Sequence, residues 1–352
     1  MRTLEDVDVK GKKVLLRLDL DVPLKDGFIV DDSRIVHSKE TLQYLIEKNC
    51  PIIVIGHMGR PEGRFVSQLT TEPLAKAISD VSGTIVTHFA TTTGTEVENA
   101  AKNLKPKEII LLENLRFFPG EEGDDPNFAQ ALAKLAEIYV FDAFGVSHRN
   151  HASVVGIPKL MPAVAGLRFG KEVQKISRVL ENPKRPFVAI VGGAKVETKM
   201  PVVENLAKIA DYVLVGGKLP LELKQSGENF ELPQNAIVAE LLPSGGDLAP
   251  EAIDRFCQII SNAQTIVWDG PMGAFEQKEF AVGTSSIAAE VSKSKAETIV
   301  GGGDTVAALS KFGYLDEISW VSSGGGAMLE FLSGKKLSAI EALEENEEKF
   351  PL

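Results

Sequence analysis

The feature that most constrains the fold of this chain is a short apolar run that ends in glycines and continues into a helix. Its clearest copy spans residues 297–309, E-T-I-V-G-G-G-D-T-V-A-A-L. Residues 298–300 predict a short buried strand, and the apolar spacing after Asp304 predicts one helix that ends at Gly313. Because a glycine turn and a helix start direct free backbone N–H groups and the positive helix end at one point, this stretch predicts an anion site.

Asp304 bears on the kind of anion that this site would bind. A carboxylate repels a phosphate unless a divalent cation lies between them, so Asp304 is expected to ligate magnesium bound to a nucleotide. The alternative is a plain turn in which Asp304 caps the helix. The same pattern recurs at other strand ends, which favours an extended polyphosphate with a base and ribose alongside. The other copies lie at 187–193, 212–217, 265–276 and 318–327. The pattern is neither a P-loop nor a G-x-G-x-x-G fingerprint, which argues against a nicotinamide cofactor.

The first half of the chain alternates apolar runs with segments of helical period. The expected strands are 14–18, 52–55, 85–87, 109–112 and 138–141, and the expected helices are 35–47, 72–81, 95–104 and 126–136. This alternation indicates a parallel sheet covered on both faces. Together the two halves predict an α/β protein of two doubly wound parallel-sheet (Rossmann-like) domains, 1–165 and 183–335, joined by a hinge helix at 166–182.

Basic side chains gather at the expected strand ends of the first domain, where ligands of such sheets bind. They are His57, Arg60, Arg116, His148, Arg149 and His151, and Arg34 at the start of the first expected helix adds to them. Guanidinium groups suit carboxylate and phosphate, so the predicted ligand is a small, multiply anionic molecule. For any single Arg the alternative is a surface ion pair or a helix cap.

Lys195 and Lys199 follow the glycines of the segment 187–193. Four residues apart at a helix start, they are expected to share one face near the positive helix end, where a bound anion would favour them. The alternative is a pair of solvated lysines. A small anion in one domain and a nucleotide in the other predict phosphoryl transfer, with the domains closing to exclude water.

Composition limits the partners. The chain of 352 residues has a net charge of −11, which argues against nucleic acid or an anionic membrane as the main partner. No apolar run approaches the roughly 18 residues of a membrane span, and residues 1–10 do not read as a secretory signal. Cys50 and Cys257 are far apart in the sequence. We therefore expect reduced cysteines and a cytoplasmic protein.

Several motifs resemble the phosphoglycerate kinase family over nearly the whole chain. They are M-R-T-L-E-D-V-D, R-L-D-L-D-V-P, G-H-M-G-R-P, L-L-E-N-L-R, D-A-F-G-V-S-H-R-N-H-A-S, G-G-A-K-V-E-T-K, I-V-W-D-G-P-M-G-A-F-E, I-V-G-G-G-D-T and S-G-G-G-A-M-L-E. The resemblance implies reversible transfer of the acyl phosphate of 1,3-bisphosphoglycerate to ADP, giving 3-phosphoglycerate and ATP. It also implies a monomer of two hinged domains, with residues 336–352 packing back on the first.

The resemblance also implies site residues. Those that would hold the phosphoglycerate are Asp19, Leu20, Asp21, Arg34, His57, Met58, Gly59, Arg60, Arg116 and Arg149. Those that would bind the nucleotide are Gly193, Lys195, Lys199, Gly217, Pro271, Glu276, Gly302, Gly303, Asp304 and Thr305. Those that would stabilise the transferred group are Arg34, Lys195, Gly303 and Gly326, and Asp304 would ligate Mg²⁺.

The chain departs from the family pattern at four places. Asp21 and Asp269 stand where the family has Asn, and an added carboxylate should weaken anion binding unless it is protonated or paired. Trp320 replaces a His, and the segment 218–252 is shorter than in the family. These departures leave open a catalytically idle phosphoglycerate-binding protein, with a nicotinamide-dependent dehydrogenase as a more distant alternative.

Overall fold

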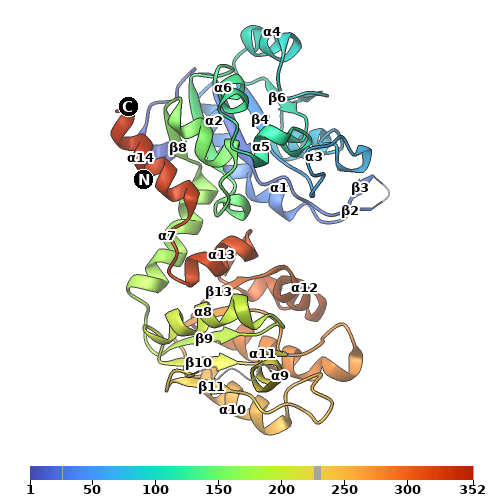
Figure 1. Cartoon of the computed structure of the whole chain (residues 1–352), viewed down its shortest axis with the longest axis vertical. Coiled ribbons are helices and arrows are strands. Elements are labelled where there is room, and N and C mark those ends of the chain that lie inside the picture. The colour runs from blue at the N-terminus through green and yellow to red at the C-terminus, as the bar shows by residue number, and fades with distance from the viewer. Residues whose placement is uncertain (26, 226–230, 352) are drawn as a thin grey trace. The chain divides into compact units, whose positions relative to one another are not determined.

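The computed structural model describes residues 1–25, 27–225 and 231–351. It divides into two compact units (Figure 1). Unit 1 comprises Met1–Val173 and Leu337–Leu352, and unit 2 comprises Gln174–Lys336. The boundary between the units falls inside helix α7 (Leu167–Glu181). The roles that the sequence assigns to the two domains, and to this helix as a hinge, stay predictions.

Unit 1 contains a six-stranded parallel sheet in the order β5-β6-β4-β1-β7-β8. The strands are β1 (Val14–Leu18), β4 (Ile52–Ile55), β5 (Val86–Phe89), β6 (Ile109–Leu112), β7 (Ile138–Asp142) and β8 (Ala163–Ala165), and a separate hairpin is formed by β2 (Leu24–Lys25) and β3 (Phe28–Ile29). Every residue of β1, β4, β6 and β7 is buried, as expected for a sheet covered on both faces.

Helices flank this sheet (Figure 1). They are α1 (Ser33–His37), α2 (Lys39–Glu47), α3 (Leu74–Ser82), α4 (Thr95–Asn103), α5 (Pro119–Glu122), α6 (Pro126–Ala133) and α14 (Ser338–Lys349). Shorter helical turns are η1 (Leu4–Asp6), η2 (Ser67–Leu69), η3 (Leu115–Phe117), η4 (Phe144–Val146), η5 (Ala152–Gly156) and η6 (Ile157–Lys159).

Two local features of unit 1 bear on the predictions. The single helix expected at 35–47 was wrong, because the helix is interrupted at Ser38. Both the backbone N–H and the hydroxyl of Ser38 donate to the carbonyl of Ile35, which ends α1 before α2 begins. At the other end of the chain, the buried Asn346 of α14 donates to the carbonyls of Pro158 and Met161 and accepts from the Ala163 N–H. This side chain ties the C-terminal helix to unit 1.

Unit 2 contains a second six-stranded parallel sheet in the order β11-β10-β9-β12-β13-β14. The strands are β9 (Phe187–Val191), β10 (Tyr212–Val215), β11 (Ala236–Val238), β12 (Thr265–Asp269), β13 (Glu297–Gly301) and β14 (Trp320–Val321). The helices and turns are α8 (Val196–Ala207), α9 (Leu219–Gln225), α10 (Pro250–Ile260), α11 (Val282–Lys293), α12 (Gly303–Phe312), α13 (Gly325–Leu332), η7 (Lys278–Phe280) and η8 (Leu315–Glu317). Numbered within the unit, the strand order is 3-2-1-4-5-6, which is that of dinucleotide-binding domains. The predicted fold class, two parallel-sheet α/β domains, is confirmed.

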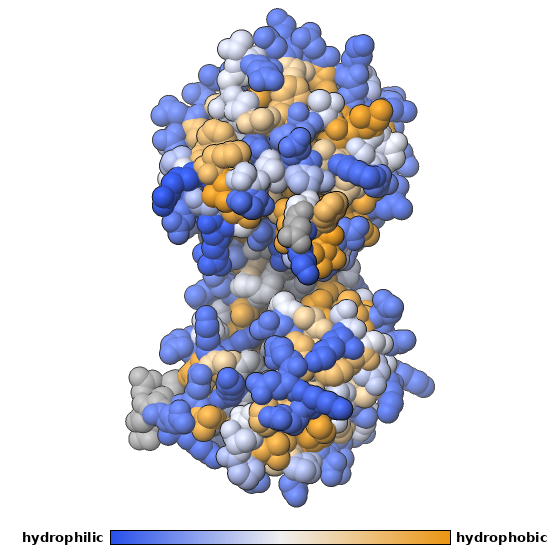
Figure 2. Space-filling view, turned by 90° about the vertical axis from the view of Figure 1, so that its right-hand side faces the viewer, coloured by the Kyte–Doolittle hydropathy of each residue, from blue (hydrophilic) through white to orange (hydrophobic). Residues whose placement is uncertain are grey.

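Each unit has its own apolar core. The core of unit 1 gathers side chains of β1 and β4 with those of α2 and α3, and the core of unit 2 gathers side chains of β9 and β12 with those of α10 and α11. On the face in Figure 2 apolar residues alternate with hydrophilic ones. Among the described residues, no helix combines the length and apolarity needed to cross a bilayer.

Candidate functional site

In unit 1 the predicted site residues meet beyond the carboxyl ends of β1, β4 and β7. Asp19 follows β1, and its Oδ2 accepts a hydrogen bond from the Gly145 N–H, which follows β7, at 3.0 Å. A Cβ at position 145 would lie 2.4 Å from the same carboxylate oxygen. Only glycine therefore allows the two strand ends to approach so closely.

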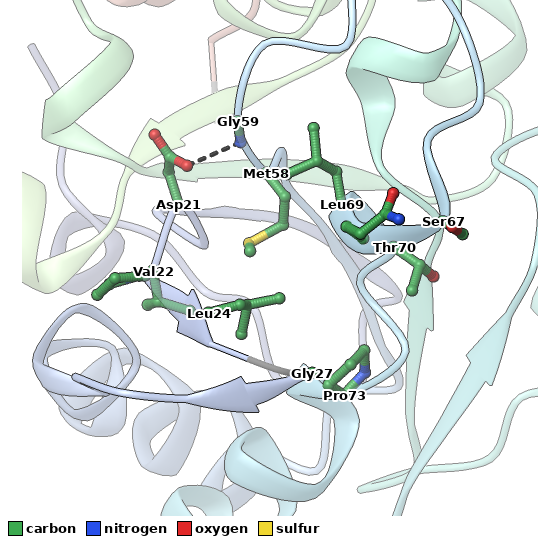
Figure 3. A pocket seen from close by; sticks show the side chains of 12 residues that line it. Asp21, Val22, Leu24, Gly27, Met58, Gly59, Ser67, Leu69, Thr70 and Pro73 are labelled. Carbon is green, nitrogen blue, oxygen red and sulfur yellow. Dashed lines mark hydrogen bonds between the residues drawn. The ribbon is translucent and has the colours of Figure 1, made fainter.

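Arg34 joins the two acidic residues that follow β1. Its Nη1 donates to the carbonyl of Asp21 at 2.7 Å and lies 3.7 Å from Asp19 Oδ1 and 3.9 Å from Asp21 Oδ2. The Gly59 N–H donates to Asp21 Oδ1 at 2.8 Å (Figure 3). His57 Nε2 lies 3.8 Å from Asp21 Oδ2. The carboxylate of Asp21 therefore lies among hydrogen-bond donors and positive charge. It is paired, which is one of the two conditions under which an added carboxylate here is compatible with anion binding.

Arg116 approaches the same cluster from η3. Its Nη1 donates to the carbonyl of Gly59 at 2.7 Å, and its Nε lies 3.2 Å from Glu122 Oε1. Arg60 and Arg149 are exposed. Leu20 and Met58 both belong to the apolar core of unit 1.

Beside Asp21 and Gly59 lies a pocket of about 640 Å³ (Figure 3). The side chains of Leu24, Met58 and Leu69 line it, together with Pro73. The pocket opens between the β2–β3 hairpin and the loop that follows β4.

Burial and neighbouring cations keep His57 neutral. Its side chain is 3% exposed. Desolvation, followed by the charges of Arg17 and Arg116, holds the pKa of His57 well below its ordinary value of 6.5. His57 can therefore offer a ligand one N–H group but no positive charge at neutral pH.

In unit 2 the predicted nucleotide residues lie around the point where the strand order reverses, between β9 and β12. The Gly193 N–H donates to the carbonyl of Pro271 at 3.1 Å. Gly217 has φ +65°, and a Cβ there would lie 2.6 Å from the Gly193 nitrogen. Three backbone segments thus meet where only glycine fits, which is the position at which such sheets bind phosphates.

The strand–glycine–helix prediction at 297–309 is confirmed. β13 ends at Gly301, Gly302 has φ +88°, and α12 begins at Gly303. Gly303 and Asp304 are exposed, whereas the buried Thr305 accepts from the Gly270 N–H through its hydroxyl at 2.7 Å. A Cβ at Gly325, the first residue of α13, would lie 2.8 Å from the Gly302 Cα. The exposed Gly326, the second residue of α13, therefore lies in a helix that begins beside the Gly302 turn.

The prediction that Lys195 and Lys199 share one helical face was wrong. Lys195 has extended backbone angles and precedes α8, and it is exposed. Lys199 lies inside α8, is buried, and forms an ion pair with the buried carboxylate of Asp269. The pKa of Asp269 is raised by burial, while Lys199 opposes that rise. Asp269, like Asp21, is therefore a paired carboxylate.

The remaining predicted nucleotide residue, Glu276, is exposed in the segment between β12 and η7. Asp304 offers an exposed carboxylate in the first turn of α12, where oxygen ligands suit Mg²⁺. Among the described residues no three His, Cys, Asp or Glu side chains gather as a metal site. One carboxylate completed by ligand phosphates is a usual way to bind magnesium, so the residues present fit a nucleotide-bound ion.

Sequence reasoning missed three residues beneath the basic cluster: Arg17, Glu121 and Ser153. All three are buried, and hydrogen bonds connect them to one another and to His57. The available signal was Arg17 itself, a charged residue within the apolar run 14–18. Buried charges of this kind are rare unless they are paired.

The two units define a class of protein with two open parallel sheets. One sheet carries basic side chains at its strand ends, and the other carries glycine turns and a helix start. Comparison with known proteins narrows the class. The sequence model of the family described as "Phosphoglycerate kinase" matches residues 4–230 and 224–335 of this chain. This chain belongs to the phosphoglycerate kinase family, and it is thus a phosphotransferase with a carboxyl group as acceptor, acting in glycolytic phosphoryl transfer.

Individual relatives agree. Phosphoglycerate kinase of Thermosipho africanus is 40% identical over 390 aligned positions that cover 97% of each chain. That of Dictyoglomus turgidum is 40% identical over 388 positions, covering 97% of this chain and 98% of the relative. Both alignments are longer than this chain of 352 residues, so these relatives carry segments that it lacks. The two matched ranges overlap at residues 224–230, inside the segment 218–252 that was expected to be shorter than in the family. Residues 226–230 lie outside the described structure.

Solved structures give the same result. The phosphoglycerate kinase of Coxiella burnetii has a TM-score of 0.82 and 34% identity, covering 97% of this chain and 98% of that one. The phosphoglycerate kinase of Pyrococcus horikoshii has a TM-score of 0.87 and 29% identity, covering 99% and 100%.

Proposed function

We propose that this chain transfers the acyl phosphate of 1,3-bisphosphoglycerate to ADP, giving 3-phosphoglycerate and ATP, and that it also runs the reverse reaction. The observation that carries the proposal is the pair of complementary sites. The basic cluster around Arg34 and His57 in unit 1 suits a small anion. The glycine turns with Asp304 and Lys195 in unit 2 suit a magnesium nucleotide.

In unit 1 the triose would be held through its carboxylate and phosphate. Arg60 and Arg149 are exposed and free to reach an anion, and Arg34 and Arg116 face the same strand ends. His57 would add a neutral N–H donor. Asp19 and Asp21 would orient these groups rather than contact the anion, because their carboxylates already accept hydrogen bonds from Gly145 and Gly59.

In unit 2 the nucleotide phosphates would lie against the glycine turns and the first turn of α12. Exposed Lys195 would meet the transferred phosphoryl group, and the free N–H groups of Gly303 and Gly326 would add to that positive field. Lys199 and Thr305 are committed to Asp269 and Gly270, so their part in phosphate binding requires a change of partner. Mg²⁺ held by Asp304 would neutralise phosphate charge.

We infer a direct in-line transfer. The reaction needs positioning and positive charge more than covalent help. At an effective dielectric constant of about 20, one unit charge about 4 Å from the transferred group contributes about 4 kcal/mol. Arg34 and Lys195 would therefore supply a large share of the barrier lowering once water is excluded. This requirement supports domain closure about α7 as part of the proposal. A monomeric enzyme and a cytoplasmic location complete the proposal, as the family resemblance and the two unpaired cysteines lead us to expect.

An assay of 1,3-bisphosphoglycerate formation from ATP and 3-phosphoglycerate, coupled to NADH oxidation, tests the proposal. We expect magnesium-dependent turnover, and we expect Lys195→Ala to lower kcat far more than it raises KM. Lys208→Ala is the matched control, because Lys208 is an exposed lysine at the other end of α8. Absence of turnover at saturating substrates would defeat the proposal, and triose binding without nucleotide binding would favour an idle binding protein.

A further inference from the structure

Arg17 occupies an unusual position for a charged residue. It lies in the central strand β1, paired with β4 on one side and β7 on the other, and its exposed fraction is 1%. Its guanidinium group makes three contacts: Nη1 donates to the carbonyl of Leu18 at 2.5 Å, Nε donates to Ser153 Oγ at 3.2 Å, and Nη2 lies 2.9 Å from His57 Nδ1. A buried charge is costly, so this arrangement calls for an explanation.

The charge of Arg17 is balanced through Ser153 rather than by direct contact. The Ser153 hydroxyl accepts from Arg17 Nε and donates to Glu121 Oε1 at 2.6 Å, and the Ser153 N–H donates to Glu121 Oε2 at 3.0 Å. Glu121 is fully buried. The Tyr139 hydroxyl donates to the Ser153 carbonyl. The network fixes the guanidinium group in one orientation, with one edge turned toward His57.

The contact with His57 fixes the position of the imidazole proton. A guanidinium group is always protonated and can only donate, so at 2.9 Å the Nδ1 of His57 must accept. A neutral imidazole that accepts at Nδ1 carries its proton on Nε2. That Nε2–H is on the side of Asp21, whose Oδ2 lies 3.8 Å away, where the Gly59 N–H and Arg34 also converge.

We propose that Arg17 is a positioning residue that locks His57 as the neutral Nε2–H tautomer and aims this N–H at the anion site of unit 1. His57 then recognises an anionic oxygen as a hydrogen-bond donor, not as a cation and not as a base. The tautomer follows from the contacts of Arg17 alone, whereas the consequence for the triose rests on the proposed function.

The tautomer is tested on the wild-type chain labelled with ¹⁵N-histidine. Long-range ¹H–¹⁵N correlation spectra at pH 7, with His57→Gln to assign the signal among five histidines, distinguish a protonated from an unprotonated ring nitrogen. We expect an unprotonated Nδ1 and a protonated Nε2 for His57. An Nδ1–H tautomer or an imidazolium would overturn the proposal, whether or not the chain has kinase activity.

The positioning role is tested by a kinetic cycle. Arg17→Met and His57→Ala should each raise the KM for 3-phosphoglycerate about tenfold or more, the loss expected for a hydrogen bond to a charged group. Because Arg17 acts through His57, the double variant should be no worse than His57→Ala alone, and the exposed Arg64→Met should change nothing. Independent, multiplied effects would refute this role. If Arg17→Met does not fold, Arg17→Met combined with Glu121→Gln replaces it, because the second change removes the buried carboxylate that Arg17 balances.

Discussion

The buried ion pair of Lys199 and Asp269 should contribute strongly to the stability of unit 2. Lys199 is 8% exposed and Asp269 3% exposed, and the pair joins α8 to the end of β12. Removing one member of a buried pair typically costs about 3–5 kcal/mol, because an uncompensated charge is left behind. We therefore expect Lys199→Met to lower the free energy of unfolding of unit 2 by about that amount.

Asp269→Asn should cost less. The amide oxygen still accepts from the ammonium group, so the hydrogen bond is kept but its acceptor is no longer charged, and we expect a loss of about 1.5–3 kcal/mol at most. Lys199→Met combined with Asp269→Asn should be more stable than Lys199→Met alone, because the unpaired carboxylate is gone.

Trp268 provides the assay. It directly precedes Asp269 and is fully buried, and the chain has two tryptophans, so a Trp320→Phe background leaves one fluorescence reporter at the pair. Urea unfolding followed by Trp268 fluorescence measures each variant against Lys208→Met, an exposed control. A loss below about 1 kcal/mol for Lys199→Met, or additive losses in the double variant, would show that the two charges do not stabilise unit 2 as a pair.

The same pair has a consequence for ligand binding. A phosphate can engage Lys199 only in competition with Asp269, so Asp269→Asn should tighten ADP binding in calorimetry, by about tenfold if one charged hydrogen bond is released. Weaker binding in Asp269→Asn would show that the carboxylate assists the nucleotide rather than competing with it.

Three further predictions concern burial and packing. Burial raises the pKa of Asp142 from 3.8 to about 6. The contribution of this carboxyl group to the free energy of unfolding is therefore present below pH about 4 and is lost, by up to about 3 kcal/mol, as the pH rises through about 6. Asp142→Asn should abolish this pH dependence, measured by urea unfolding between pH 4.5 and 7. Gly270→Ala should lower the melting temperature markedly, because φ is +95° and a Cβ would lie 2.2 Å from the carbonyl oxygen of Gly192. Gly303→Ala should leave the melting temperature unchanged, because a Cβ there would meet open space. Equal melting temperatures for the two variants would contradict the close approach at Gly270. Asn346→Ala removes three buried hydrogen bonds and should destabilise unit 1 by about 3 kcal/mol in urea unfolding. Glu345→Ala, at an exposed position of the same helix, should be neutral. Similar unfolding midpoints for the two variants would show that the Asn346 side chain does not hold α14.

The sheets and their glycine turns could be predicted from the sequence because their signals are local. Apolar runs such as 187–191 mark strands, and glycines directly after them mark turns at the strand ends. The end of the first helix at Ser38 escaped prediction, because one serine hydroxyl competing for a carbonyl leaves the apolar period unchanged.

The partners of the charged site residues could not be predicted in the same way. Lys199 and Asp269 are 70 positions apart, and Arg17 and Ser153 are 136 positions apart, so their contacts arise only when strands and loops are assembled. For Asp21 and Asp269 the sequence could state that pairing would make a carboxylate tolerable. For Asp269 the identity of the cation depends on how α8 and β12, distant in sequence, are assembled.

The most direct test of the proposed reaction follows the phosphoryl group itself. With [γ-³²P]ATP, Mg²⁺ and 3-phosphoglycerate, we predict that label passes to the acyl phosphate of 1,3-bisphosphoglycerate, and that chelation of the metal or Lys195→Ala suppresses this transfer. Label released only as inorganic phosphate, or retained in ATP at saturating triose, would contradict it.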